Sequence, residues 1–428
     1  MASISQISLS IAPTNKSTSE IVRRRKNAKF EKVDKQKSYT DLPTVLLTEI
    51  VCRLSASSLY KILKIPSSLR NKEFHSIISD PRFPELFKSY DNNTSNVHPC
   101  SLVAYNQDAN MFLIEFDSDR NFVLTQLNTD FISKVMRKKF VSPYLDYKVL
   151  GSCNGCLLVS LGYHIRHHRG TLSTCESIAL VNPLTHRYVR IPRPSISSKS
   201  NRYAFDYVPN IGKYKVMRFC DDDYESFTVS ESKWSKPQWV RNRKPNYSTY
   251  IKNQIFEGGI EPVVFKGSSY WVVDEMSNIL KLDMDKEEFE LIPTPWSVYK
   301  TLFCDAVLSV LNDSLCMVFV LSEVFDIWVM NHNNINNQVK EPWTKFMTIP
   351  DPSFSIQTSF EIIRVFDNGN IVILAPDKKK PEQKKVYVYD TKQKKMIQEK
   401  VIQIQGMGIL SVRKVEPSFL SITHHPQP

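Results

Sequence analysis

The sequence predicts a mainly β protein with a small all-α segment at its N-terminus. The β part is predicted to be a β-propeller of about six degenerate blades, with a β-sandwich as the alternative. Short apolar or alternating runs separated by turn residues fill the chain after about residue 98, and they recur in units of roughly fifty residues. Only 11 glycines occur in the chain, although tight turns between blades normally use them, and this keeps the sandwich alternative open.

Three short helices are predicted before residue 84. In the first, over 43–54, Leu46, Leu47 and Ile50 recur at helical spacing. The second covers 55–65 and the third 68–79, and a proline follows each of them. Three helices in about forty residues form too small a core to stand alone, so we expect part of their apolar surface to rest on a partner or on the following domain.

The repeat in the β region is carried by its turns. Turn pairs that favour positive φ each introduce an apolar strand, and the next strand ends in a polar turn within SIALVNPLT, ILKLDMD, DIWVMN and VYVYDTK. A further strand often closes with Ile-Pro, at 191–192, 292–293 and 349–350. The turn pairs are Asn154-Gly155, Gly267-Ser268, Asn312-Asp313 and Asn368-Gly369.

Composition divides the chain into a disordered basic tail at 1–38, a helical domain at 39–84, a β domain at 98–410 and a C-terminal tail at 411–428. The formal charge of +12 is partly local, because residues 21–37 carry eight Lys/Arg against two acids. The run Arg23 to Lys26 resembles a nuclear localisation signal, and a solvated tail is the favoured alternative.

Several classes of protein are disfavoured. The longest apolar stretch, 315–321, is too short to span a bilayer, so no membrane contact is expected. Eight cysteines at no repeating spacing predict a reducing compartment, the nucleus and/or the cytoplasm. Motifs of nucleophile elbows, zinc proteases and phosphate loops are missing from the sequence, so we expect a non-enzyme with no catalytic residues and no cofactor.

Three groups of residues are candidates for a metal, catalytic or stacking site. Cys153 and Cys156, with His164, His167, His168 and Cys175 downstream, offer a candidate zinc site, but both cysteines are better interpreted as core thiols and no metal is expected. The carboxylates at 221–223 and 287–288 are expected in exposed turns rather than as acid/base pairs. The tryptophans are expected to pack in the core more than to form a stacking surface for nucleic acid or sugar: Trp234, Trp239, Trp271, Trp296, Trp328 and Trp343.

The segment DLPTVLLTEIVCRLSASSLYKI resembles the F-box, a helical docking motif. The β region is similar to the F-box-associated domain of plant F-box/kelch-type proteins. The matching motifs occur in the family's order across residues 40–400: GSCNGCLLVS, VNPLTHRYVRIPRP, YAFDYVPNIGKYKVMRF, FKGSSYWVVDE, ILKLDMDKEEFELIP, IWVMN with EPWTKFMTIP, and DNGNIVIL.

This resemblance implies a substrate-recognition subunit that joins a Skp-type adaptor and, through it, a cullin in an SCF ubiquitin ligase. The chain would recruit a protein substrate, through residues that the sequence does not identify, for ubiquitination and degradation. The alternatives are a scaffold protein whose degenerate F-box no longer docks and, less favoured, a basic nucleic-acid binder. The residues expected to contact the adaptor are Leu42, Pro43, Leu46, Leu47, Ile50, Leu54 and Leu59.

The F-box pattern is not perfect. Ser55 stands where the family has proline, Phe74 replaces a tryptophan, and about five extra residues lie at 66–70. Phe74 still supplies a large apolar side chain, so we expect these departures to weaken adaptor binding rather than abolish it.

Overall fold

A computed structural model describes residues 43–414 apart from gaps at 67–71, 81, 94–99, 107–109, 117–121, 131–145, 167–171, 195–200, 221–222, 232, 237, 240–261, 274, 300–304, 312–313, 322–323, 332–341, 351–360, 367, 378, 381–382 and 403–410. The predicted tail at 1–38, with its basic run, and the predicted contact residue Leu42 lie outside the described residues.

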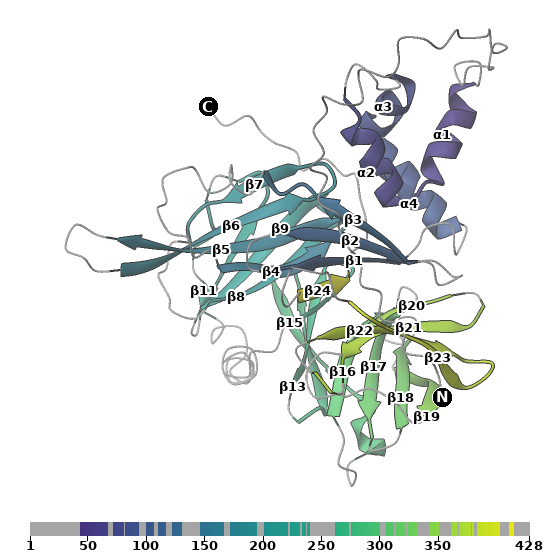
Figure 1. Ribbon diagram of the computed structural model, residues 1–428. Coiled ribbons are helices and arrows are strands. Elements are labelled where there is room, and N and C mark those ends of the chain that lie inside the picture. The colour runs from purple at the N-terminus through teal and green to yellow at the C-terminus, as the bar shows by residue number, and fades with distance from the viewer. Residues whose placement is uncertain are drawn as a thin grey trace, which may run out of the picture.

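Four helices lie together beside the sheet that contains β1–β3 (Figure 1). They are α1 (Thr44–Cys52), α2 (Ala56–Lys64), α3 (Lys72–Ser79) and α4 (Phe83–Asn93). The first three match the predicted helices, whereas α4 extends past the predicted boundary at 84. Ser55, where the family pattern has proline, caps α2, because its hydroxyl oxygen accepts a hydrogen bond from Ser58 N at 3.3 Å.

The described strands form six four-stranded antiparallel sheets. In spatial order, the first sheet contains β24 (Ser411–Lys414), β1 (Cys100–Tyr105), β2 (Met111–Phe116) and β3 (Phe122–Leu127), the second β4 (Asp146–Cys153), β5 (Cys156–Arg166), β6 (Leu172–Asn182) and β7 (Arg187–Ile191). The third contains β8 (Arg202–Val208), β9 (Lys213–Cys220), β10 (Asp223–Thr228) and β11 (Gln238–Trp239), and the fourth β12 (Val263–Phe265), β13 (Ser268–Val273), β14 (Asn278–Asp283) and β15 (Glu288–Pro293). The fifth contains β16 (Asp305–Leu311), β17 (Ser314–Val320), β18 (Val324–Met330) and β19 (Trp343–Pro350), and the sixth β20 (Glu361–Val365), β21 (Asn370–Pro376), β22 (Lys384–Asp390) and β23 (Lys395–Val401).

The last described strand, β24, closes the ring of sheets. β24 pairs antiparallel with β1, with Val412 opposite Ala104, and so completes the first sheet with residues from the far end of the sequence. The boundary predicted at 410 falls before this strand, which belongs to the propeller. The predicted six-bladed propeller is confirmed, and the β-sandwich alternative is wrong.

Hairpin turns with positive φ join the first two strands of several sheets. Asn154 and Gly155 have φ of 45° and 72°, as the predicted turn requires. In the fourth sheet the positive values fall at Lys266 and Gly267, so that turn begins one residue earlier than the sequence predicted. Gly369 has φ of 88°, and a Cβ there would lie 2.5 Å from Thr391 Oγ1. The predicted turn at 312–313 lies outside the described residues.

A second repeated turn joins the third and fourth strands of alternate sheets. In each case a side-chain oxygen accepts the backbone N–H groups two and three residues further on, and the residue that begins the return has positive φ. The acceptors are Asn182, Asp283 and Asp390, and the positive-φ residues are His186, Glu287 and Lys394. These turns explain the recurring polar ends of the sequence repeat.

Two tryptophans tie neighbouring sheets together through the recurring Ile-Pro sequence. Trp234 Nε1 donates to Pro192 O at 2.7 Å, and Trp343 Nε1 donates to Pro293 O at 2.8 Å. Trp234, Trp271 and Trp343 are buried, which confirms the predicted core role for these three. Trp296 and Trp328 are partly buried against the same core, and the side chain of Trp239 lies outside the described residues.

Because β24 closes the ring, a charged residue should lower the stability of the protein at a buried position of this strand but not at an exposed one. Val412 is 3% exposed in the core between the first and last sheets, whereas the neighbouring Ser411 is exposed. Val412→Asp should lower the free energy of unfolding by about 3 kcal/mol or more, because it buries an unpaired charge. Ser411→Asp should change it by less than about 0.5 kcal/mol. Urea denaturation of both variants measures the difference, and equal effects would contradict closure by this strand.

Candidate functional site

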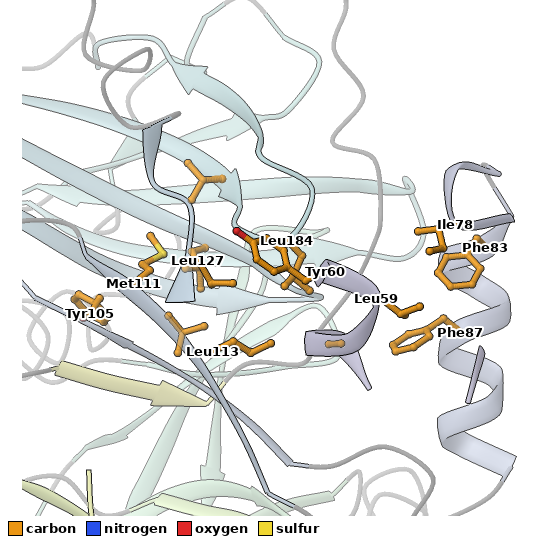
Figure 2. Packing of buried hydrophobic residues seen from close by; sticks show 14 of the residues in the cluster. Leu59, Tyr60, Ile78, Phe83, Phe87, Tyr105, Met111, Leu113, Leu127 and Leu184 are labelled. Atoms are coloured by element: carbon orange, nitrogen blue, oxygen red, sulfur yellow. The ribbon is translucent and has the colours of Figure 1, made fainter. Parts of the chain in front are cut away.

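The four helices share one hydrophobic core with the first two sheets of the propeller. Figure 2 shows α2 between the two parts: Leu59 points toward Ile78, Phe83 and Phe87 of the other helices, and Tyr60 points toward Leu184 on the β side. Leu113 and Leu127 belong to the same buried cluster. The helices are therefore packed onto their own β domain, as one of the two outcomes expected from their small core.

The outer side of α1 stays exposed. Val45, Leu46 and Ile50 have relative exposures of 77%, 46% and 44%, and Pro43 just before the helix is exposed as well. Several large apolar side chains are thus exposed together on one short helix, which makes this side of α1 the candidate site. Glu49 lies beside them and forms an ion pair with Arg53 at 2.6 Å, one turn further along α1.

The inner side of α1 is buried in the core. Leu47, Val51 and Cys52 are at most 3% exposed. Burial raises the pKa of the Cys52 thiol to about 11, so it remains a neutral, apolar side chain near pH 7.

The seven predicted contact residues therefore separate into groups. Pro43, Leu46 and Ile50 are exposed. Leu47 and Leu59 are buried by the chain itself, and Leu54 is partly buried against the same core. Leu42 lies outside the described residues.

Sequence reasoning missed Val45, the most exposed large apolar residue among those described. A usable signal was present. Six of the nine residues in TVLLTEIVC are apolar, which is more than one narrow core-facing stripe requires. A short helix of that composition must expose part of its apolar surface unless it is covered on all sides.

The two cysteines of the candidate zinc pair have other surroundings in the structure. Cys156 is 0% exposed, and burial raises the pKa of its thiol to about 12. Cys153 Sγ donates to Asp206 Oδ1 at 2.9 Å. Within the described ranges, no three His, Cys, Asp or Glu side chains are grouped so as to hold a metal ion. The side chains of His164, His167, His168 and Cys175 lie outside the described residues.

Buried and half-buried carboxylates in the propeller serve as links between strands and sheets. Glu225 is paired with Arg218 at 2.9 Å, and both side chains are at most 1% exposed. Glu287, one of the acidic turn residues weighed as a catalyst, forms an ion pair with Lys215 of the neighbouring sheet at 2.7 Å. Both carboxylates therefore have charged partners within the propeller. Of the helices described, none is long and apolar enough to cross a membrane.

Comparison with known families decides what kind of chain this is. The model of the F-box associated beta propeller domain matches residues 101–421. The chain belongs to this family.

Two Arabidopsis thaliana proteins are similar to this chain. An F-box/LRR-repeat/kelch-repeat protein is 24% identical over 349 residues, which cover 79% of this chain and 84% of that protein. A putative F-box protein is 21% identical over 268 residues, covering 59% of this chain and 61% of that protein. The resemblance found in the sequence is confirmed. The solved structure of YjhT aligns with 74% of this chain and 98% of its own at 11% identity, with a TM-score of 0.32, too low to support a conclusion.

Adjacent leucines of α1 should differ sharply in their effect on this F-box-associated propeller protein. Leu47→Ala should lower the local stability of α1 by about 2–5 kcal/mol, because it leaves a cavity in the shared core. Leu46→Ala, on the exposed side, should change it by less than about 0.5 kcal/mol. Native-state hydrogen exchange of the α1 amides measures both values. A larger effect at Leu46 than at Leu47 would show that the helix is rotated from the orientation described.

Proposed function

We propose that this chain is the substrate receptor of an SCF-type ubiquitin ligase. In this proposal α1 binds a Skp-type adaptor, and the propeller binds a protein substrate. The observation that carries the proposal is the exposed apolar side of α1, in an F-box-like segment that precedes an F-box-associated propeller.

The adaptor contact is assigned to the exposed residues of α1. Pro43, Leu46 and Ile50 remain from the set expected on sequence, and Val45 is added. An amphipathic helix of this kind binds by laying its apolar side into a groove of the partner. Each half-exposed Leu or Ile that becomes buried contributes up to about 1.5 kcal/mol to binding. Leu47 and Leu59 support the contact indirectly, because they hold the helices in place.

The mechanism is proximity. Bound to the adaptor and, through it, to a cullin, the receptor would hold its substrate close to a ubiquitin-charged carrier and raise the local concentration of the acceptor lysine. The bond-making steps belong to other subunits, and no residue of this chain is given a catalytic role. The site of action follows the sequence expectation, the nucleus and/or the cytoplasm.

The proposal predicts that charge on the outer side of α1 abolishes adaptor binding without unfolding the chain. Leu46→Asp combined with Ile50→Asp should weaken the affinity for purified Skp-type adaptor by about a hundredfold or more, because two desolvated carboxylates would face an apolar groove. Isothermal titration calorimetry with the full chain measures this affinity. Both positions are exposed, so the circular dichroism spectrum should not change.

A matched control places the same charge elsewhere. Val298 is 60% exposed in the short helix η5 (Pro295–Val298) of the propeller, and Val298→Asp should leave adaptor affinity unchanged. Unchanged affinity of the double variant would contradict the assignment of the contact to α1. Failure of the unmodified chain to bind adaptor would contradict the receptor proposal and favour a scaffold protein with a degenerate F-box.

A further inference from the structure

A buried carboxylate of the propeller holds the first turn of α2. Glu115 of β2 is 1% exposed, and its two oxygens accept hydrogen bonds from Ala56 N at 3.0 Å and Ser57 N at 3.1 Å. The first N–H groups of a helix have no partner within the helix, and the helix dipole favours a negative charge at that end. Glu115 satisfies two of these groups, and Ser55 Oγ satisfies the N–H of Ser58.

The dependence between Glu115 and α2 runs both ways. Burial raises the pKa of Glu115, whereas the hydrogen bonds from Ala56 and Ser57 oppose that rise. If α2 left the propeller, the N–H groups of Ala56 and Ser57 would exchange their bonds to a carboxylate for bonds to water, and Glu115 would lose two of its donors. Separation of the two parts is therefore costly at this point.

A second attachment lies one turn further along α2. Tyr60 is 4% exposed, and its hydroxyl oxygen accepts a hydrogen bond from Asn128 N, just after β3, at 2.7 Å. The Tyr60 ring meets the ring of His186 edge-on at 5.8 Å, and His186 lies in the turn between β6 and β7. Lys64 Nζ lies 3.3 Å from His186 Nδ1. Tyr60 thus contacts the first and the second sheets.

We propose that Glu115 is a positioning residue, which together with Tyr60 fixes α2, and through it the exposed side of α1, in one orientation on the propeller. Two polar attachments on one short helix, joined by the shared core, prevent it from pivoting about either one. The functional consequence rests on the proposed function: adaptor and substrate would be held at a set distance and angle. This arrangement suits a protein substrate whose acceptor lysine must reach a ubiquitin-charged carrier at a fixed position in the ligase.

Hydrogen exchange in the full chain tests the attachment without any partner. Glu115→Gln keeps the size of the side chain but replaces one acceptor oxygen by a donor group, so one N–H of α2 loses its partner. Amides of α2 should then exchange about tenfold faster or more, the factor that corresponds to about 1.4 kcal/mol. Amides of β14, in a distant sheet, should keep their rates.

A matched control removes an equally buried glutamate away from the helices. Glu225 is 0% exposed in the third sheet, and Glu225→Gln should leave α2 exchange unchanged even where it lowers the stability of the propeller. Tyr60→Phe, which removes only the hydroxyl acceptor, provides a second variant should Glu115→Gln fail to fold. It should accelerate exchange in α2 several-fold.

Orientation is measured by a second readout. Spin labels on non-natural residues at the exposed positions Thr44 in α1 and Lys392 in the β22–β23 turn should give one narrow distance distribution in the unmodified chain. Glu115→Gln should broaden it while adaptor affinity stays within about threefold, because the outer side of α1 is intact. Unchanged exchange and an unchanged distribution in Glu115→Gln would overturn the proposal. Loss of adaptor affinity in the unmodified chain would instead overturn only the proposed function.

Discussion

The packing of α2 between the other helices and the propeller is the constraint on which the arrangement of this protein depends. One side of α2 carries Leu59 into the helical core, and Tyr60 carries the adjoining side onto the first two sheets. Because a segment this small cannot form a stable core alone, the β domain supplies the missing apolar contacts. Among the described residues, the outer side of α1 stays exposed, together with Ile65 and Leu86 elsewhere in the helical segment. The packing that stabilises the helices therefore also determines which apolar side chains they expose.

The propeller reaches its regular turns with few glycines. Among the described residues, seven non-glycine residues and four glycines have positive φ. A left-handed conformation costs a non-glycine residue roughly 1–2 kcal/mol. In three sheets an Asn or Asp side chain offsets this cost by accepting two backbone N–H groups of the same turn. The scarcity of glycine, which kept the sandwich alternative open on sequence grounds, therefore does not conflict with six blades.

Much of the fold follows from local patterns in the sequence. Helical spacing predicted α1–α3, and the recurring turns predicted the blades, because both depend on residues close together in the chain. The fourth helix was missed, although Phe83, Phe87 and Tyr90 have helical spacing, since the Asp80-Pro81 stop hid it. The role of β24 was missed because its partner, β1, lies at the other end of the domain.

The candidate site was predictable only in outline. The F-box-like sequence includes the helix that exposes apolar side chains, but spacing alone does not decide whether Leu46 or Leu47 points inward in a helix that is apolar on most sides. That choice is made by the tertiary core. Glu115 gave no sequence signal, because the N–H groups that it accepts lie 58 and 59 residues earlier in the chain. Contacts of that separation arise from the fold and have no local pattern.

The central claim is that this chain offers an adaptor only the outer side of α1, while α2 stays on the propeller. Hydrogen exchange of the full chain, compared with and without purified Skp-type adaptor, tests it directly. The account predicts added protection in Thr44–Cys52 and no change in the amides of Ala56 and Ser57, which already bond to Glu115. Faster exchange at Ala56 and Ser57 on binding would show that α2 leaves the propeller, and no added protection in α1 would show that the adaptor does not bind there; either result would contradict the account.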